Sequence, residues 1–524
     1  MIQSNIKSPG VYISELNAFP NSVVPVATAV PAFVGYTPQA VYEGKSYTNV
    51  PVRITSLADF MTIFCFPDPP PPASQAMQYD PEYYFVLQKS QPEKGDYMVI
   101  NGSFYSIVPD PNTIYYMYNA IKLFYDNGGA DAYIVSVGGY GPSSGTPTAP
   151  GAHVVNPNVS LNDLKKGLVA LQQEQEPTMY ICPDSTLMTL DNYGSLIQAM
   201  LAQNVEMQTA ISVFDIIGGD NPDPIMYMDD ITAFRNSTGT QGLNYGTAYY
   251  PFVGTTVMQS GDINYTNMFG GDTKQLDALI NPTGDNASIN AIMANINNPN
   301  SGLTVTQNNN ALINASPTYS LMVKHVLTDA NILPPSSAMA GVMTTIDNLD
   351  GVWQAPANIS ITDAVSLPIR LTESQQGSLN MDAVSGKSIN AIRFFNGLGI
   401  LVWGARTLDG NSLDWKYLSV RRTMIFLEQS CKLAAHAYVF QPNDKNTWEG
   451  VKAMISSFLT NIWKEGGLQG ANASDAFSVD CGLGTTMTGD DILNGFMNVT
   501  VQVAVVHPAE FIVLSFQQKM VASS

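Results

Sequence analysis

The chain has 524 residues, of which 45% are hydrophobic and only 13% are charged, and its formal net charge is −20. One hydrophobic core rarely organises a chain of this length, so we expect two or three domains. The acidic balance argues against a nucleic-acid-binding protein, since such proteins place clustered Lys and Arg against phosphates. The low charge leaves much neutral surface, which is typical of a subunit that buries its surface against copies of itself.

The net charge is unevenly distributed. Residues 380–524 carry 11 basic and 12 acidic side chains, a net charge of −1, whereas the 379 residues before them carry −19. We therefore expect the C-terminal part to pack in a crowded assembly and the acidic part to face water.

Cysteine spacing and apolar runs indicate in which cellular compartment the chain folds and whether it spans a membrane. The four cysteines lie far apart without a CxxC pattern, which predicts neither a disulfide framework nor a zinc site. The first residues lack the apolar core of a secretory signal. The uncharged run 16–42 contains four prolines that would break a membrane helix. We expect a reducing cytoplasm and no membrane span.

The first 150 residues predict an extended arm at 1–25 and then a mixed α/β region at 26–150. An apolar strand is expected at 31–36. Consecutive prolines at 67–72 favour polyproline geometry and cannot pair in a central sheet, so we expect a peripheral insertion at about 40–110.

A helix and a strand follow that insertion. The stretch 113–127 predicts a helix, because apolar residues such as Met117 and Ile121 recur at helical spacing and Gly128 ends the pattern. The apolar stretch 132–137 predicts a buried strand. Together they indicate a mixed sheet flanked by helices.

A second α/β region is predicted at 151–360, after a Gly/Ser/Pro-rich linker. Its expected elements are a helix at 161–173 and strands at 178–182, 211–217 and 249–253. The Asn-rich stretch 296–317 predicts a long exposed loop.

The region 361–524 has the clearest pattern. We expect one helix at about 417–438 and another at 446–465, which Asn446 and Glu449 would begin with a capping box. Two strands are expected at the end of the chain, at 498–506 and at 511–516. Strands at a sheet edge offer unpaired backbone groups that another chain can extend.

Motifs for catalysis are weak. The histidines, at 153, 325, 436 and 507, lie in no recognisable catalytic motif. Residues 336–342, SSAMAGV, faintly resemble the serine segment of subtilisins, but no matching histidine or aspartate motif accompanies them. No phosphate-binding loop or HExxH site occurs. The pair Asp490 and Asp491 is interpreted as the polar start of a helix rather than an acid/base couple.

Eight segments, in order along the chain, resemble the contractile tail sheath family of bacteriophages, R-type pyocins and extracellular contractile injection systems. The segments are 8–15 (SPGVYISE), 31–37, 127–137, 351–358 (GVWQAPAN), 388–408, 415–422, 442–471 and 498–516. Residues at about 40–110 and 220–320 carry little of this resemblance.

The resemblance implies an α/β and α+β multidomain fold. It would contain a mixed-sheet core domain, a subtilisin-like but non-catalytic α/β domain at 151–360, a peripheral insertion, and a C-terminal core sheath domain at 361–524. The two ends of the chain would supply strands to neighbouring subunits by β-augmentation. The residues expected in these strands are Val11, Tyr12, Ile13, Glu15, Val499, Val501, Val503, Val505, Phe511 and Val513.

The function implied is that of a structural subunit, not an enzyme, with no cofactor. Stacked rings, hexameric by family resemblance, would surround an inner tube protein and meet baseplate and terminal cap proteins. Assembly would take place in the bacterial cytoplasm, and contraction would drive the tube through a target envelope. Lys452 and Lys464 are candidate tube contacts, although exposed lysines on an amphipathic helix are more often its solvated face.

Several questions stay open at this point. The mature particle is a virion tail, a released particle or an envelope-anchored injection system, and the sequence does not distinguish these. A cryptic serine hydrolase acting through Ser336 or Ser337 is one alternative function. A surface adhesion or receptor-binding protein is the other, favoured by the Asn/Thr/Gly-rich middle of the chain.

Overall fold

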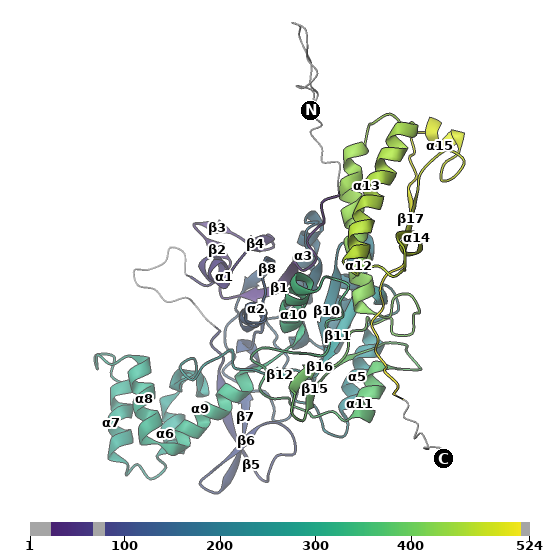
Figure 1. The fold of residues 1–524 in the computed structure, drawn as a ribbon. Helices are drawn as coiled ribbons and strands as arrows, with labels where there is room; N and C mark the ends of the chain where they lie inside the picture. The colour runs from purple at the N-terminus through teal and green to yellow at the C-terminus, as the bar shows by residue number, and fades with distance from the viewer. Residues whose placement is uncertain (1–22, 67–78, 515–524) are drawn as a thin grey trace, which may run out of the picture. The chain divides into compact units, whose positions relative to one another are not determined.

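The chain forms two compact units in a computed structural model that describes residues 23–66 and 79–514 (Figure 1). Of the described residues, the larger unit comprises 27–66, 79–422 and 507–514, and the smaller comprises 23–26 and 423–506. The backbone therefore crosses from one unit to the other at three places, after residues 26, 422 and 506.

The larger unit is built on a nine-stranded mixed sheet with the order β14-β16-β15-β11-β10-β9-β1-β8-β4. The six strands from β15 to β8 run parallel, β16 and β4 run antiparallel to them on either side, and β14 pairs antiparallel with β16 at the edge. The strands are β1 (Pro31–Thr37), β4 (Val52–Ile54), β8 (Ala132–Gly139), β9 (Met179–Ile181), β10 (Ile211–Asp215), β11 (Gly246–Tyr250), β14 (Ile359–Ser360), β15 (Asn390–Phe395) and β16 (Gly399–Val402).

Helices pack on the central strands. Connections between parallel strands are right-handed, so reversing the direction of travel across the sheet reverses the face that the helix covers. The helices α3 (Leu161–Ala170), α4 (Leu190–Met207) and α5 (Tyr227–Ser237) connect β8 to β11 in one direction. The helix α2 (Met117–Asp126) precedes β8 in the long connection from β1 to β8, which runs in the other direction, and α10 (Ser336–Leu349) packs against α2. Strands β1, β9, β10 and β11 are accordingly buried along their whole length.

The expectation of a mixed sheet with flanking helices is confirmed. The sheet contains strands from the segments 26–150, 151–360 and 361–524, so these three parts of the sequence share one core. The subtilisin-like character of the middle segment stays a prediction.

Further elements lie outside the main sheet of the larger unit. An antiparallel sheet, β5-β7-β6, falls within the stretch 40–110. Its strands, and the remaining elements of this unit, are β5 (Tyr83–Gln88), β6 (Tyr97–Ile100), β7 (Ser103–Pro109), β2 (Val41–Tyr42), β3 (Lys45–Ser46), α1 (Leu57–Phe64), β12 (Val253–Gly254), β13 (Ile332–Leu333), α6 (Thr273–Ile280), α7 (Ala287–Ile296), α8 (Val305–Ala315), α9 (Pro317–Ala330) and α11 (Glu373–Asn380).

The predicted Asn-rich loop at 296–317 is wrong over most of its length, because α8 occupies it. The Thr304 side chain accepts from the backbone N–H of Gln307, and the Gln307 side chain accepts from that of Thr304. This capping box satisfies free backbone groups at the start of the helix. The side chain of Asn309 is buried and accepts a hydrogen bond from the Tyr319 hydroxyl at 2.5 Å.

The smaller unit is a helical hairpin with a two-stranded antiparallel sheet. Its elements are α12 (Leu418–Ala435, which begins in the larger unit), α13 (Lys445–Lys464), α14 (Ala473–Ala476), β17 (Phe477–Asp480), α15 (Gly489–Leu493) and β18 (Thr500–Val503). Phe426 on α12 meets Phe458 on α13 edge to face, with ring centroids 6.0 Å apart.

The two helices predicted at 417–438 and 446–465 are confirmed within a few residues, but the start of α13 differs. The Asp444 side chain caps it by accepting from the N–H groups of Asn446 and Thr447, so the expected capping box of Asn446 and Glu449 is wrong. An aspartate one residue before a helix serves the same purpose. The polar helix start expected at Asp490 and Asp491 is confirmed as α15, with Thr488 as its cap.

Neither a membrane-spanning helix nor a metal-binding cluster is found in the described part of the chain. None of its helices combines the length and apolar character needed to span a bilayer. Across the same residues, His, Cys, Asp and Glu side chains do not gather in groups of three able to hold a metal ion.

Candidate assembly surfaces

The smaller unit contains an apolar groove with a volume of about 970 Å³. Helices α12 and α13 form its walls, strand β18 borders it, and the loop between the two helices closes one end. Its apolar lining includes Met424, Leu427, Cys431, Val451, Ile455, Leu459, Met497, Val499, Val501 and Val503. A groove of this size and composition can accept an extended apolar segment.

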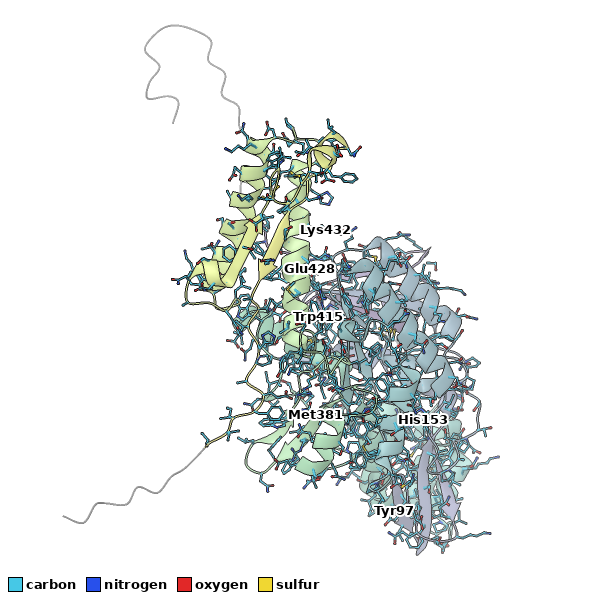
Figure 2. All side chains as sticks on the ribbon, turned by 90° about the vertical axis from the view of Figure 1, so that its right-hand side faces the viewer. Tyr97, His153, Met381, Trp415, Glu428 and Lys432 are labelled. Atoms are coloured by element: carbon cyan, nitrogen blue, oxygen red, sulfur yellow. The ribbon has the colours of Figure 1, made fainter. Side chains whose placement is uncertain are left out.

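Spacing along the helices explains the groove walls. Val451, Ile455 and Leu459 recur every four residues on α13, and Leu427 and Cys431 do so on α12, so each helix turns an apolar stripe toward the groove. Burial raises the pKa of the Cys431 thiol to about 11, which keeps it uncharged near neutral pH. Figure 2 shows Glu428 and Lys432, polar residues that also border the groove, along α12.

Strand β18 offers a free edge beside the groove. It pairs with β17, from Thr500 opposite Asp480 to Val503 opposite Phe477, and within the described residues no other strand pairs with it. The N–H of Ala504 donates to the carbonyl of Ala476 at 2.8 Å on the β17 side. Because backbone groups alternate along an antiparallel strand, those of Val501 and Val503 point away from β17. That edge can pair with one more strand.

The four valines predicted on one face of the C-terminal strand have two different environments. Val499, Val501 and Val503 line the groove, and Val501 is 37% exposed. Val505 is buried and forms an antiparallel bridge with Leu468 in its own unit. The strand is also shorter than the predicted stretch 498–506. Val505 therefore stabilises the smaller unit itself, and only the other three valines face the open groove.

The segment after β18 is apolar and exposed. Phe511, Ile512, Val513 and Leu514 expose 69, 79, 87 and 73% of their surface. The strand predicted at 511–516 is not a strand over its described residues, 511–514. A strand needs a partner for its backbone hydrogen bonds, and none of the described strands pairs with residues 511–514. Four consecutive exposed apolar side chains indicate a surface that another chain covers.

The N-terminal residues predicted to join a neighbouring sheet, Val11, Tyr12, Ile13 and Glu15, lie outside the described residues. The candidate tube contacts lie on α13. Lys452 is about one-third exposed, with its Nζ 3.6 Å from a carboxylate oxygen of Glu449, and Lys464 is exposed at the last residue of the helix.

The serine segment of the larger unit is buried. Ser336 begins α10, and its backbone N–H and its hydroxyl donate to the two carboxylate oxygens of Asp215 at 2.8 and 2.5 Å. Ser336 and Ser337 are both 0% exposed. Burial raises the pKa of Asp215 to about 7. A hydroxyl without access to solvent cannot attack a substrate, so this arrangement fits a structural role.

The histidines of the larger unit make other contacts. His153 lies with its Nε2 3.0 Å from the Thr186 carbonyl, and the Nδ1 of His325 is 2.6 Å from Asp96 (Figure 2 labels His153). The His507 ring packs edge to face on Tyr417. Within the described residues, none of the hydrogen bonds of these rings involves Ser336 or Ser337. The geometry for a serine nucleophile with a histidine base is not present there.

Residues 411–519 match the family model described as the phage tail sheath C-terminal domain. The match includes α13, the groove strand β18 and the exposed segment 511–514. A curated relative, the tail sheath protein of Vibrio phage KVP40, is 27% identical over 139 residues. That alignment covers 26% of this chain and 20% of the relative, so the chain spans about a fifth of the relative's length. The chain therefore contains a phage tail sheath C-terminal domain, at residues 411–519.

Solved structures show the same fold over nearly the whole of this chain. The sheath complex of PVC, an extracellular contractile injection system, in its contracted state has a TM-score of 0.57 and 24% identity, covering 98% of each chain. The helical sheath of the anti-feeding prophage in its contracted state has a TM-score of 0.58 and 24% identity, covering 98% of this chain and all of the other.

Some residues of the groove were missed by sequence reasoning. Met424, Leu427 and Cys431 on α12 are separated by three and four residues, which was the available signal. The ion pair between Arg406 and Glu510, 104 residues apart, has no local signal at all, because neither neighbourhood predicts the other.

Proposed function

We propose that this protein is the structural subunit of a contractile sheath, which polymerises helically around an inner tube and contracts to drive that tube through a target envelope. The observation that carries the proposal is the combination of an open β18 edge beside an apolar groove and an exposed apolar segment at 511–514. Each copy thus carries both a site for one more strand and a segment of the right chemistry to fill it.

Polymerisation follows from this complementarity. The segment 511–514 of one copy, in an extended conformation, pairs with the outward backbone groups of Val501 and Val503 in a second copy and places alternate apolar side chains in the groove. Because the donated segment and the accepting edge are different parts of the chain, one copy can accept a strand from a second copy and donate its own segment to a third, so the contact can run head to tail. Such a contact generates rings or helical filaments. The N-terminal residues Val11 to Glu15 are proposed to add a further strand in the same way.

Contraction requires no nucleotide in this proposal. Main-chain hydrogen bonds between copies hold while each subunit rotates as a rigid body, and the free energy is the difference between two packings summed over many copies. The extended state is metastable until a baseplate releases one end. The proposed partners are the inner tube protein, baseplate and terminal cap proteins, and further copies of this chain in hexameric rings.

The near-neutral C-terminal part is proposed to face the tube, with Lys452 and Lys464 in weak polar contacts that break on contraction. The remaining part of the chain carries most of the net charge of −20 and would face outward. Assembly is proposed to occur in the bacterial cytoplasm, and the mature particle to be a tail or a released particle. No catalytic activity is part of the proposal.

The two alternative functions have less support. A serine hydrolase needs an accessible nucleophile, and Ser336 and Ser337 are completely buried. A receptor-binding surface protein would have no need of an open strand edge and a complementary apolar segment on one chain.

Expression with the inner tube protein, followed by negative-stain microscopy, tests the function. The proposal predicts striated tubes that shorten and widen on treatment with denaturant or acid. Isolated subunits or smooth, non-contracting filaments would contradict it. An esterase and peptidase screen of the same preparation tests the hydrolase alternative, with no activity above that of a Ser336→Ala variant expected.

A further inference from the structure

We infer that Arg406 and Glu510 form a clasp that fixes the point at which the C-terminal segment leaves the larger unit, so that residues 511–514 are presented to a second copy in a preset direction. Arg406 and Glu510 both belong to the larger unit. The inference rests on the proposed function, since it concerns how the segment that joins two copies is positioned.

The ion pair is bidentate and shielded from water. The Arg406 Nε lies 3.0 and 3.1 Å from the two carboxylate oxygens of Glu510, and its Nη2 lies 2.6 Å from Oε2. The Arg406 side chain is 5% exposed and that of Glu510 is 22% exposed. The Asn380 side-chain amide donates to Glu510 Oε1 at 2.8 Å. A paired carboxylate with an additional donor has one favoured position, which distinguishes this contact from a mobile surface ion pair.

Arg406 is itself anchored to the central sheet. Its backbone N–H donates to the Asn390 side chain at 2.8 Å, and its carbonyl accepts from Thr247 Oγ1 and Asn390 Nδ2, both at 2.9 Å. Thr247 is on β11 and Asn390 is on β15. The guanidinium group of the clasp therefore extends from a backbone that cannot move independently of the sheet.

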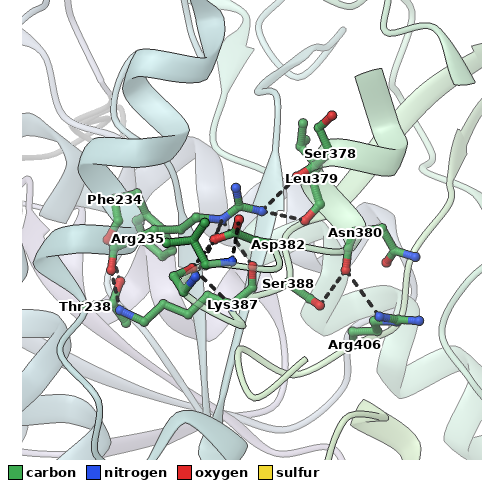
Figure 3. A network of polar contacts seen from close by, with 12 residues as sticks. Phe234, Arg235, Thr238, Ser378, Leu379, Asn380, Asp382, Lys387, Ser388 and Arg406 are labelled. Carbon is green, nitrogen blue, oxygen red and sulfur yellow. Dashed lines mark hydrogen bonds and ion pairs between the residues drawn. The ribbon is translucent and has the colours of Figure 1, made fainter. Parts of the chain in front are cut away.

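A second network fixes the Asn380 side of the clasp (Figure 3). Asn380 is the last residue of α11, and its carbonyl accepts from Ser388 Oγ at 2.6 Å and from Arg406 Nη1 at 3.3 Å. Arg235, on α5, donates to the carbonyls of Ser378 and Leu379 at 3.0 and 2.9 Å. These bonds satisfy carbonyls at the C-terminal end of α11, which otherwise have no partner within the helix.

Within the described residues, the clasp marks a change in the environment of the C-terminal segment. His507 packs on Tyr417, Glu510 binds Arg406, and the next four residues are each more than two-thirds exposed. Glu510 is also the last acidic residue of the chain. The clasp thus separates a docked stretch from an exposed apolar one.

A fixed exit point matters for assembly because a free segment must lose more conformational entropy when it binds. When residues 511–514 start from a fixed position at Glu510, that entropy loss is smaller. The effective concentration of the segment at a neighbouring groove is then higher. Arg406, Asn380 and Glu510 are accordingly positioning residues, acting through the segment rather than by touching the second copy.

Spin-label distance measurements on the dilute, unassembled subunit test the clasp directly. One label is placed at Val513→Cys and the other at Leu413→Cys, an 83% exposed position of the same unit, in a Cys431→Ser background. The other cysteines, Cys65, Cys182 and Cys481, are buried. We expect a narrow distance distribution in the native sequence and one at least twice as broad in Glu510→Gln and Glu510→Ala.

Assembly is measured separately by sedimentation against protein concentration. Glu510→Gln is expected to raise the threshold concentration for polymer at least tenfold, whereas Glu449→Gln, which removes the exposed partner of Lys452, leaves it unchanged. Spin-label distance distributions of equal width in native protein and Glu510→Gln, or a broad distribution in native protein, would overturn the clasp. A broader distribution with an unchanged threshold would overturn its role in assembly. If the native protein forms no polymer, the proposed function fails. The widths of the spin-label distance distributions still test whether the clasp forms.

Discussion

Asp215 accepts hydrogen bonds from both the backbone N–H and the hydroxyl of Ser336, at 2.8 and 2.5 Å, and so joins the end of β10 to the start of α10. Both side chains are buried, and the described histidines do not join them. The pair connects a central strand to a helix that covers the sheet, which is a structural rather than a catalytic arrangement.

The stability of the larger unit should depend on the protonation of Asp215. Burial raises the pKa of this carboxyl from its usual 3.8 to about 7, so between these values the folded state binds more protons than the unfolded state. Its contribution is therefore fully present below about pH 4, falls as the pH rises through that window, and levels off above about 7. Asp184, with its pKa raised to about 6 by burial, acts in the same direction.

Replacing Asp215 with Asn removes the contribution of the Asp215 carboxyl to the pH dependence of stability. Since one pKa unit corresponds to about 1.4 kcal/mol, the difference in unfolding free energy between native protein and Asp215→Asn should change by about 1 to 4 kcal/mol from pH 4 to pH 7. Urea unfolding at a series of pH values measures it. Parallel curves for the two proteins over this range would contradict the assignment of the proton to Asp215.

The free edge of β18 predicts a position-specific effect of proline. The N–H of Val501 points away from β17, so Val501→Pro removes no hydrogen bond within the subunit, but it blocks one that a donated strand would accept. We expect its melting temperature to stay within a few degrees of the native value while polymer formation is lost.

The matched control is the next residue along the same strand. The N–H of Gln502 points toward β17, so Gln502→Pro should destabilise the smaller unit itself, by about 1 to 3 kcal/mol, because a hydrogen bond of the β17–β18 ladder is lost. Circular dichroism and sedimentation of the two variants separate the effects. Normal polymers from Val501→Pro would show that this edge does not accept a strand.

The exposed segment should matter to assembly and not to folding. Phe511 and Val513 are 69% and 87% exposed, so Phe511→Asp with Val513→Asp should change the free energy of unfolding by no more than about 0.5 kcal/mol. Burying either carboxylate in an apolar groove is strongly unfavourable, and polymer should not form. Ile512→Asp with Leu514→Asp is the comparison, because these residues lie on the opposite face of an extended segment. Unimpaired assembly of the first variant would exclude the segment as the donated strand.

Charge reversal at Lys452 and Lys464 tests the tube-facing surface. If these side chains contact the tube, Lys452→Glu with Lys464→Glu should reduce the fraction of inner tube retained in purified sheaths while sheath length and striation stay normal. Lys445→Glu, at the first position of the same helix, is the control. Retention of the tube at native levels would show that the two lysines are only the solvated face of α13.

Local sequence patterns predicted where helices and strands form better than they predicted which distant residues those elements contact. The periodic apolar residues of 417–438 and 446–465 indicated α12 and α13, and buried runs such as 132–137 indicated strands of the central sheet. The resemblance to tail sheaths, read from eight short segments, was confirmed by the match over 411–519 and by the shared fold. Each helix or strand signal comes from a single stretch of about twenty residues or fewer.

Features that depend on distant residues were not predictable in this way. The α8 helix was missed because Asn favours loops, whereas the capping box at Thr304 and the buried contact of Asn309 with Tyr319 stabilise a helix. The strand at 511–516 was predicted from its apolar pattern, but a strand does not form without a partner. The Arg406–Glu510 pair joins residues 104 positions apart, which no local pattern specifies.

Disulfide trapping between copies tests the central claim most directly. Val501→Cys and Val513→Cys are introduced together in a Cys431→Ser background, and the assembled protein is oxidised and run on a denaturing gel without reductant. Pairing of the 511–514 segment with β18 of a second copy predicts a ladder of covalent multimers, which is absent when either cysteine is introduced alone and when Val501→Cys is combined with Lys464→Cys. Monomers only, from a preparation that microscopy shows to be polymerised, would contradict the account.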